Sequence, residues 1–322
     1  MILPYYGGVP KLKKSPITWA LILVNVAVTI AVYNFQMLNN MELADFYKTE
    51  FLEIQGKLYA QIIGEYPQHY GEVQKVLAQQ TESGNRSMAR NLGQLAMADA
   101  NFKRLSQYYP FYGDEVAIKF WRKNYNLFLK LRDTHPNFQY GISALDYNWF
   151  NWGSYMFVHA GISHLLGNMW FLLVVGAMVE AILGGMGFLL LYLVCGVSAA
   201  FFYFFLSAPS AIPLVGASGA VSGILAFYSV VRWQKKVRFI TMLFLVKWEY
   251  LMLYLPAWVG FVYWMLLDLT GYFSQLSHMG GVAHAAHLGG AAVGVLFGIV
   301  FRWRKTLAHS IFRYNPWVHK LK

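Results

Sequence analysis

The chain has 322 residues, of which 57% are hydrophobic, 18% are aromatic and only 13% are charged. Soluble domains carry about 25% charged residues, so this composition excludes an ordinary water-soluble protein and indicates a protein of the lipid bilayer. The formal net charge of +11 would ordinarily raise nucleic acid as a partner. Where the excess charge lies along the chain decides that question.

The positive charge flanks the apolar runs. Residues 36–146 contain twelve Lys and Arg against twelve Asp and Glu, so this stretch is neutral and is expected to face water. Outside it, the basic residues cluster at 11–14, 232–238, 302–305 and in the tail. Lys and Arg near the ends of spans mark the cytoplasmic side of a membrane. The charge pattern therefore predicts membrane topology, and we expect no nucleic-acid partner.

Six apolar segments are long enough to cross a hydrocarbon core of about 30 Å, which needs about 20 residues as helix. The predicted spans are 17–35, 159–183, 186–207, 218–233, 251–272 and 281–303. The first segment is not followed by a convincing signal-peptide cleavage site, so we predict that it stays in the protein as a membrane span. If the basic cluster at 11–14 lies in the cytoplasm, six crossings place the other basic clusters in the cytoplasm as well. We therefore expect an all-α, six-helix membrane protein with both termini in the cytoplasm.

The same spans divide the chain into five parts. They are a cytoplasmic N-terminus (1–16), a first transmembrane helix (17–35), an extracytoplasmic insert (36–146), a core of helices two to six (147–303) and a basic cytoplasmic tail (304–322). Helix-like segments at 73–97 and 115–132 predict a mostly helical insert, and nothing in it indicates its role or partner. The short apolar segment 239–250 fits an interfacial segment or one arm of a hairpin.

The sequence Gly216-Ala217-Ser218-Gly219 follows a loop and opens the fourth predicted span. A serine at a helix start is most simply an N-cap. Glycines on both sides, however, permit a sharp turn, bring backbone N–H groups close to whatever the serine attacks, and let another helix approach. Ser218 is therefore a candidate nucleophile, with Gly216 and Gly219 as supporting residues.

A histidine inside an apolar helix needs a partner that offsets its cost, and His287 is such a residue. Gly290, Gly294 and Gly298 follow it at offsets of three, seven and eleven, so they share its helical face. Small residues also share the face of Ser218 on the fourth span: Ser222, Ala226 and Ser229. Two such faces can pack closely and bring Ser218 to His287. The alternative is an ordinary helix contact with a structural histidine.

The predicted topology places both residues near the outer leaflet. The fourth and sixth spans run from outside to inside, with Ser218 in the first turn of one and His287 about two turns into the other. His164 and Asn168, spaced i,i+4 on the second span, share one face in the same outer half. Their donors could hold an oxyanion formed when a serine attacks a carbonyl. The alternative for this pair is an interhelical hydrogen bond.

A carboxylate that would complete a triad is harder to find. Glu180 is predicted near the cytoplasmic end of the second span, and Glu249 lies on the cytoplasmic side. Asp268 is predicted at the outer end of the fifth span, where an interfacial carboxylate needs no catalytic explanation. The sequence therefore predicts a Ser–His dyad.

A metal or proton transporter is a different class of hypothesis. It would use some of the histidines His159, His164, His278, His284 and His287. Zinc requires a tight histidine cluster or carboxylate and thiolate partners, and the spacing offers no set beyond His284 and His287. We therefore expect no metal and no cofactor.

Three motifs resemble those of the rhomboid intramembrane serine proteases, on the spans where that family carries them. They are Gly216-Ala217-Ser218-Gly219, Ala286-His287-Leu288-Gly289-Gly290 and His164-x-x-x-Asn168. The resemblance covers roughly residues 140–304 and the position of the first span. It implies a six-helix rhomboid fold, with Ser218 as nucleophile and His287 as general base. It also implies an oxyanion hole made by His164, Asn168 and the Ser218 backbone N–H.

The resemblance further implies a cofactor-free endopeptidase that cuts single-pass membrane proteins within or next to their transmembrane segment. Its partners would be these substrates and the lipid bilayer, and its location a multi-pass position in a bacterial inner membrane. The alternative is a catalytically silent rhomboid-like protein that binds membrane clients, which usually lacks residues equivalent to Ser218 and His287. Two features depart from the family: Phe150 and Asn151 replace a common Trp-Arg pair, and the insert 36–146 is long.

Overall fold

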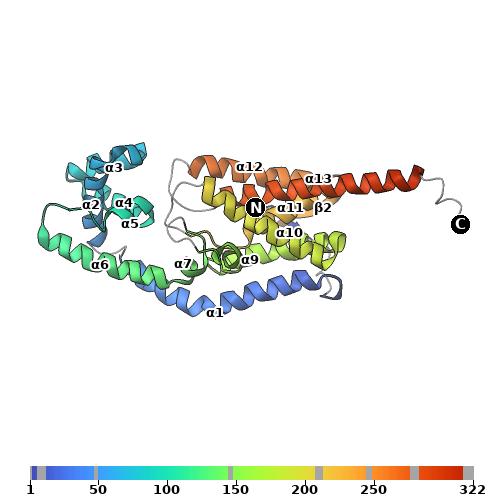
Figure 1. The fold of residues 1–322 in the computed structure, drawn as a ribbon, viewed down its shortest axis with the longest axis horizontal. Coiled ribbons are helices and arrows are strands. Elements are labelled where there is room, and N and C mark those ends of the chain that lie inside the picture. Colours follow the sequence, from blue (N-terminus) through green and yellow to red (C-terminus); the bar gives the residue numbers. More distant parts are fainter. Residues whose placement is uncertain are drawn as a thin grey trace.

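The computed structural model describes residues 2–5, 12–46, 50–143, 148–206, 213–243, 249–275 and 283–314. His278 and residues 315–322 of the predicted tail lie outside this part of the chain. The described residues are mostly helical and form two regions, a bundle of long helices and a smaller lobe beyond one end of it (Figure 1). Helices α1 and α6 run between the two regions (Figure 1).

The bundle contains long helices and a few short ones. Its helices are α1 (Pro16–Phe46), α8 (Asn151–Ser154), α9 (Ile162–Phe171), α10 (Ala177–Leu206), α11 (Ser218–Val231), α12 (Ala257–Gln275) and α13 (His284–Tyr314). A π-helix, η4 (Leu172–Gly176), joins α9 to α10. Short 3-10 helices are η1 (Leu12–Lys14) and η3 (Tyr155–Phe157).

Among the described residues, three helical stretches are long and apolar enough to cross a membrane: Pro16–Phe46, Ile162–Leu206 and His284–Lys305. Helix α11 is apolar but shorter. The stretch Ile162–Leu206 covers most of both predicted segments, 159–183 and 186–207, and its helical geometry breaks between them at Gly184, with φ 74° and ψ 166°. Glycine tolerates this positive φ without a side-chain clash. The structure thus supports a helical membrane protein, and the number of six spans stays a prediction.

The predicted fifth span begins too early. Residues Glu249–Pro256 form strand β3, which pairs antiparallel with β2 (Lys236–Leu243), and β2 pairs with β1 (Ile2–Tyr5). Helix α12 therefore starts at Ala257 rather than at 251, because the preceding residues make a ladder of backbone hydrogen bonds. For segment 239–250 the described residues form arms of a hairpin, and 244–248 lie outside the described part.

Glu180 of α10 binds the first turn of α1. Its Oε1 accepts the backbone N–H of Ile17 at 2.9 Å, and its Oε2 accepts the backbone N–H and the hydroxyl of Thr18 at 2.8 and 2.7 Å. The first N–H groups of a helix have no partner within it, and the helix N-terminus favours a negative charge. This buried carboxylate therefore attaches α1 to the rest of the bundle.

The lobe has a hydrophobic core of its own. Its helices are α2 (Phe51–Glu65), η2 (Pro67–His69), α3 (Glu72–Glu82), α4 (Arg86–Ala98), α5 (Ala100–Leu105), α6 (Glu115–Thr134) and α7 (Pro136–Tyr140). The helix predicted at 115–132 is confirmed as α6. The segment predicted at 73–97 is instead two helices, because the chain turns at Gly84, with φ 90°. Large buried side chains fill the core: Phe51, Tyr59, Phe102, Trp121 and Tyr125.

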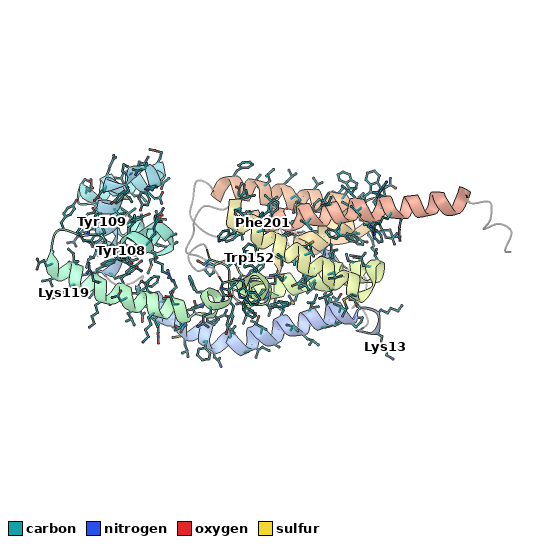
Figure 2. All side chains as sticks on the ribbon, in the orientation of Figure 1. Lys13, Tyr108, Tyr109, Lys119, Trp152 and Phe201 are labelled. Atoms are coloured by element: carbon teal, nitrogen blue, oxygen red, sulfur yellow. The ribbon has the colours of Figure 1, made fainter. Side chains whose placement is uncertain are left out.

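Figure 2 shows Lys13 at the end of the bundle away from the lobe, whereas Tyr108, Tyr109 and Lys119 lie on the lobe itself. This arrangement agrees with a topology in which the basic N-terminal cluster and the insert lie on opposite sides of a membrane. Helix α1 continues to Phe46, well past the predicted span end at Phe35, and so reaches from the bundle toward the lobe (Figure 1). The orientation of the chain stays a prediction.

Candidate active site

Helices α11 and α13 approach each other backbone to backbone. A Cβ added at Gly290 would collide with the backbone oxygen of Gly219, and a Cβ at Gly294 would collide with that of Gly223. The glycines of α13 therefore face α11, as their spacing predicts. On α11 the closest approach uses Gly219 and Gly223 instead of the predicted face, which was Ser222, Ala226 and Ser229.

This close packing places Ser218 beside His287. Ser218 is the first residue of α11, and His287 lies in the first turn of α13, one turn nearer the helix start than predicted, because α13 begins at His284. The distance from Ser218 Oγ to His287 Nε2 is 2.8 Å. The Ser218 hydroxyl can therefore donate its proton to the imidazole.

The other nitrogen of His287 lies on a carboxylate. Asp268 Oδ1, from α12, is 2.8 Å from His287 Nδ1, and Asp268 is only 4% exposed. An Nδ1–H donated to this oxygen leaves Nε2 free to accept the Ser218 proton. The sequence analysis left Asp268 out of the predicted pair, whereas in the structure its buried carboxylate contacts the histidine.

Asp268 also contacts a second histidine. His284 Nδ1 lies 2.8 Å from the same oxygen, Asp268 Oδ1. A Cβ at Gly271 would collide with the His284 ring, so this glycine leaves the space that the ring occupies. A carboxylate and a glycine at i,i+3 on one helix thus face two histidines at i,i+3 on the next. That pairing is the sequence signal that could have pointed to Asp268.

His164 and Asn168 of α9 lie beside the turn that precedes Ser218. A Cβ added at Gly216 would be 2.9 Å from His164 Nε2 and 3.4 Å from Asn168 Nδ2. Gly216 also has φ 109°, so glycine is required here both for the backbone conformation and for space. Asn168 Nδ2 is buried and makes no hydrogen bond within the described structure. A free buried donor therefore lies next to the serine turn.

Backbone hydrogen bonds hold the serine turn in place. Ile142 and Leu214 exchange N–H···O bonds of 3.0 and 2.7 Å, and Gly216 N–H donates to Tyr155 O at 2.8 Å. Asn151, at the start of α8, donates its Nδ2–H to Gly141 O at 2.8 Å and so ties α8 to the end of α7. Asn151, one of the two positions where the expected Trp-Arg pair is replaced, thus makes a structural hydrogen bond of its own.

The structure thus brings together the predicted residues Ser218 and His287, with His164 and Asn168 beside the same turn. It adds Asp268 and His284, which the sequence prediction left out of the site. Among the described residues, Asp268, His284 and His287 form a cluster of side chains of types that bind metal ions. The expectation that only the two histidines could group is therefore corrected by Asp268.

Comparison with known proteins gives a family model and a relative that match this chain. A family model described as the Rhomboid domain matches residues 146–304, which contain all the site residues named above. Rhomboid-like protein 11, chloroplastic, from Arabidopsis thaliana is 33% identical over 151 residues, which are 46% of this chain and 51% of that protein. The match therefore spans about half the length of this relative. Residues 146–304 of the chain are therefore a domain of the rhomboid family.

Proposed function

We propose that this chain is an intramembrane serine endopeptidase that cleaves single-pass membrane proteins within or next to their transmembrane segment. The observation that carries the proposal is the line of contacts from Ser218 through His287 to Asp268, with 2.8 Å at each contact. Nucleophile, base and orienting carboxylate in this order are the arrangement used by serine hydrolases on several unrelated folds. Membership of the rhomboid family supports the same reaction class and the substrate class.

In this reaction Ser218 Oγ attacks the carbonyl carbon of the scissile peptide bond while His287 Nε2 takes the hydroxyl proton. The imidazolium then gives that proton to the leaving amine, which departs and leaves an ester on Ser218. A water molecule attacks this ester with His287 again acting as base, which releases the carboxylic acid product. Asp268 holds the reactive tautomer and stabilises the imidazolium without taking the proton itself.

The tetrahedral intermediate carries a negative oxygen that needs donors. Asn168 Nδ2 supplies one that has no other partner in the described structure, and His164 lies on the same side of the turn. The Ser218 backbone N–H is the third donor in this proposal. Each such donor contributes roughly 3 to 4 kcal/mol to transition-state stabilisation in hydrolases.

The proposed setting is a multi-pass position in a membrane, with the lobe on the outer side and Lys13 inside. We propose the bacterial inner membrane as the membrane in which the chain resides. Within the bundle, α11 and α13 start on the side that faces the lobe (Figure 1), so the lobe stands on the side from which a substrate would reach Ser218.

The proposal is tested by labelling the purified full chain in detergent with a fluorophosphonate probe, which reacts with activated serines. We expect labelling of the wild type and its loss in Ser218→Ala and His287→Ala. Ser222→Ala is the matched control, because Ser222 lies one turn further along α11 and is buried. This variant should label like the wild type.

Labelling that survives Ser218→Ala and disappears in Ser222→Ala would move the nucleophile to Ser222. A wild type that neither labels nor cleaves a reporter substrate with a transmembrane segment would favour the alternative, a silent rhomboid-like protein that binds membrane clients. Cleavage of the reporter inside or beside its transmembrane segment would support the substrate class.

A further inference from the structure

The proposed hydrolysis leaves one feature of the site unused. A serine hydrolase needs one histidine, yet a second one, His284, lies on the same carboxylate oxygen of Asp268 as His287 does. The ligand atoms of these three side chains all lie within 4.8 Å of one another. In addition, Asp268 Oδ2 is buried and has no hydrogen-bond partner within the described structure.

We propose that Asp268, His284 and His287 form a zinc-binding site, and that zinc bound there switches off the serine hydrolase. The binding is independent of the proposed function, whereas the inhibition rests on it. Two imidazoles and one carboxylate, with a fourth position left to water, are an established donor set for zinc in proteins.

The geometry needs only a small adjustment to admit the ion. Zinc lies about 2.0 to 2.2 Å from nitrogen and oxygen ligands, so neighbouring ligand atoms in a tetrahedral site are about 3.3 Å apart. The two contacts of 2.8 Å between Asp268 Oδ1 and the imidazoles would therefore open by roughly half an ångström. The unpartnered Oδ2 offers a second oxygen, so the carboxylate can turn toward the ion without breaking another hydrogen bond.

The three ligands lie on two rigid helices and one of them reaches the surface. The His284 side chain is 16% exposed, whereas those of Asp268 and His287 are 6 and 7% exposed. An ion can therefore enter beside His284. Its ring lies where it does because Gly271 has no side chain, so the packing of α12 against α13 fixes this ligand in position.

Zinc on His287 would remove the general base. The ion uses the Nδ1 lone pair, so the proton that Nδ1 donated to Asp268 moves to Nε2, and the same exchange occurs on His284. No proton is released overall. An imidazole with Nε2–H and a metal on Nδ1 can only donate to Ser218, so it cannot accept the hydroxyl proton. Loss of the metal restores the active tautomer.

Binding is tested on the Ser218→Ala protein, full length, in detergent and without a histidine tag, so that the result does not depend on activity. Zinc affinity is measured by competition with a fluorescent zinc chelator. We expect one zinc ion per chain, with an affinity at least tenfold lower in the His284→Gln and Asp268→Asn versions of this protein. His69→Gln is the matched control, because His69 is an exposed histidine of the lobe, and it should leave the affinity unchanged.

X-ray absorption on the zinc-loaded Ser218→Ala protein gives a measurement that needs no further variant. Two imidazole nitrogens and at least one oxygen in the zinc shell support the site. Absence of stoichiometric zinc, a shell without two imidazoles, or affinity unchanged in both variants would overturn it and leave His284 as a second hydrogen-bond donor to Asp268.

Inhibition is tested on the chain with Ser218 intact, as the rate of fluorophosphonate labelling with increasing free zinc. Each variant is compared with its own zinc-free rate. We expect the zinc concentration for half inhibition to rise at least tenfold in His284→Gln, with no inhibition by magnesium or calcium, which prefer oxygen ligands. Zinc that binds without slowing labelling would overturn the switch. A zinc-free wild type that does not label would instead count against the proposed function and leave the binding result unaffected.

Discussion

The lobe and the bundle each bury a carboxylate, and they hold it with different partners. In the lobe, Asp99 Oδ2 accepts the hydroxyl of Tyr59 at 2.6 Å and Oδ1 accepts the backbone N–H of Phe102 at 2.6 Å. In the bundle, Asp268 contacts two imidazoles, one of which contacts Ser218. Both carboxylates are buried and hydrogen-bonded, as buried charges must be.

The difference lies in the chemistry of the partner side chain. Burial raises the pKa of the Tyr59 phenol far above its ordinary value, so Tyr59 keeps its proton and donates it in a hydrogen bond to Asp99. The Asp99 pair therefore caps α5 and fixes the lobe. A histidine beside Asp268 can take and return a proton, because its two nitrogens serve as donor and acceptor in turn. A buried, hydrogen-bonded carboxylate thus stabilises the fold in the lobe and, in the proposed function, serves the reaction in the bundle.

The largest effect expected from this comparison is that of Asp268→Asn on activity. An asparagine in this position can present its amide group to Nδ1 and so favour the tautomer whose Nε2 carries the proton. In hydrolases with the same three groups this change costs about 10⁴-fold in rate. We therefore expect fluorophosphonate labelling of Ser218 to slow by roughly 10³-fold or more, with the thermal stability of the bundle little changed.

The matched variant in the lobe is Asp99→Asn. It should leave the labelling rate as it is and lower the stability of the lobe by about 1 to 3 kcal/mol, because buried donors lose part of their acceptor. A labelling rate that is equal in Asp268→Asn and the wild type would show that Asp268 has a structural role only.

The next largest effect is expected from removing a large side chain from the core of the lobe. Trp121 is 1% exposed, stacks on Tyr125 with ring centroids 4.9 Å apart, and donates its Nε1–H to Gln55 Oε1 at 3.2 Å. Trp121→Ala should therefore destabilise the lobe by about 3 to 5 kcal/mol. The measurement is the temperature at which the lobe becomes sensitive to limited proteolysis. Phe120→Ala is the control, because Phe120 is adjacent and 44% exposed.

In the bundle, α11 and α13 pack through glycines, so we expect a larger side chain at this contact to reduce activity. Gly290→Ala places a methyl group against the backbone oxygen of Gly219, so α11 and α13 must separate near Ser218. A displacement of about 1 Å at a catalytic contact costs roughly 10²-fold in rate, and we expect labelling to slow by about that factor. Gly167→Ala on α9 is the control, since its Cβ would meet open space. Equal labelling of both variants would contradict the role given to the glycine contact.

Much of this site could be predicted because its signals are local. Flanking glycines mark Ser218, the three-residue and four-residue offsets place Gly290 and Gly294 on one face, and i,i+4 spacing pairs His164 with Asn168. Both helices of the site also start on the same side of the bundle. Such periodicities depend only on helix geometry, which a sequence expresses directly.

The sequence analysis left out Asp268 because its distance from the helix end depends on the pairing of strands β2 and β3, which hydrophobic periodicity does not reveal. Residues 251–256 are apolar enough to be counted as helix, yet they form β3 against β2, so α12 begins six residues later and ends at Gln275. Asp268 thus lies about two turns inside the helix rather than near its outer end. The Gly84 turn in the lobe is a similar case, in which one residue with positive φ divides a segment that looks helical.

The smallest effect expected is a pH dependence at the junction of the two regions. His135 caps α7, where its Nδ1 accepts the N–H of Asn137 at 3.1 Å, and Asn137 Oδ1 accepts Gln36 Nε2 of α1 at 2.8 Å. Burial lowers the pKa of His135 from its ordinary value of 6.5. The unfolded chain therefore takes up this proton at higher pH than the native chain does. The contribution of His135 to stability is present above about pH 6.5 and is lost as the pH falls through the native pKa.

His135→Asn keeps an acceptor for the cap and cannot titrate, so it isolates this contribution. We expect the thermal stability of the wild type to fall more steeply than that of the variant between pH 8 and pH 5, by at most about 1 kcal/mol, the usual contribution of an N-cap. Limited proteolysis of the lobe at each pH measures the difference, and His69→Asn controls for an exposed histidine. Parallel pH profiles of the wild type and His135→Asn would show that the junction does not sense this proton. A steeper wild-type profile would show that protonation loosens the attachment of the lobe, while the buried Asp99 pair holds the lobe itself together.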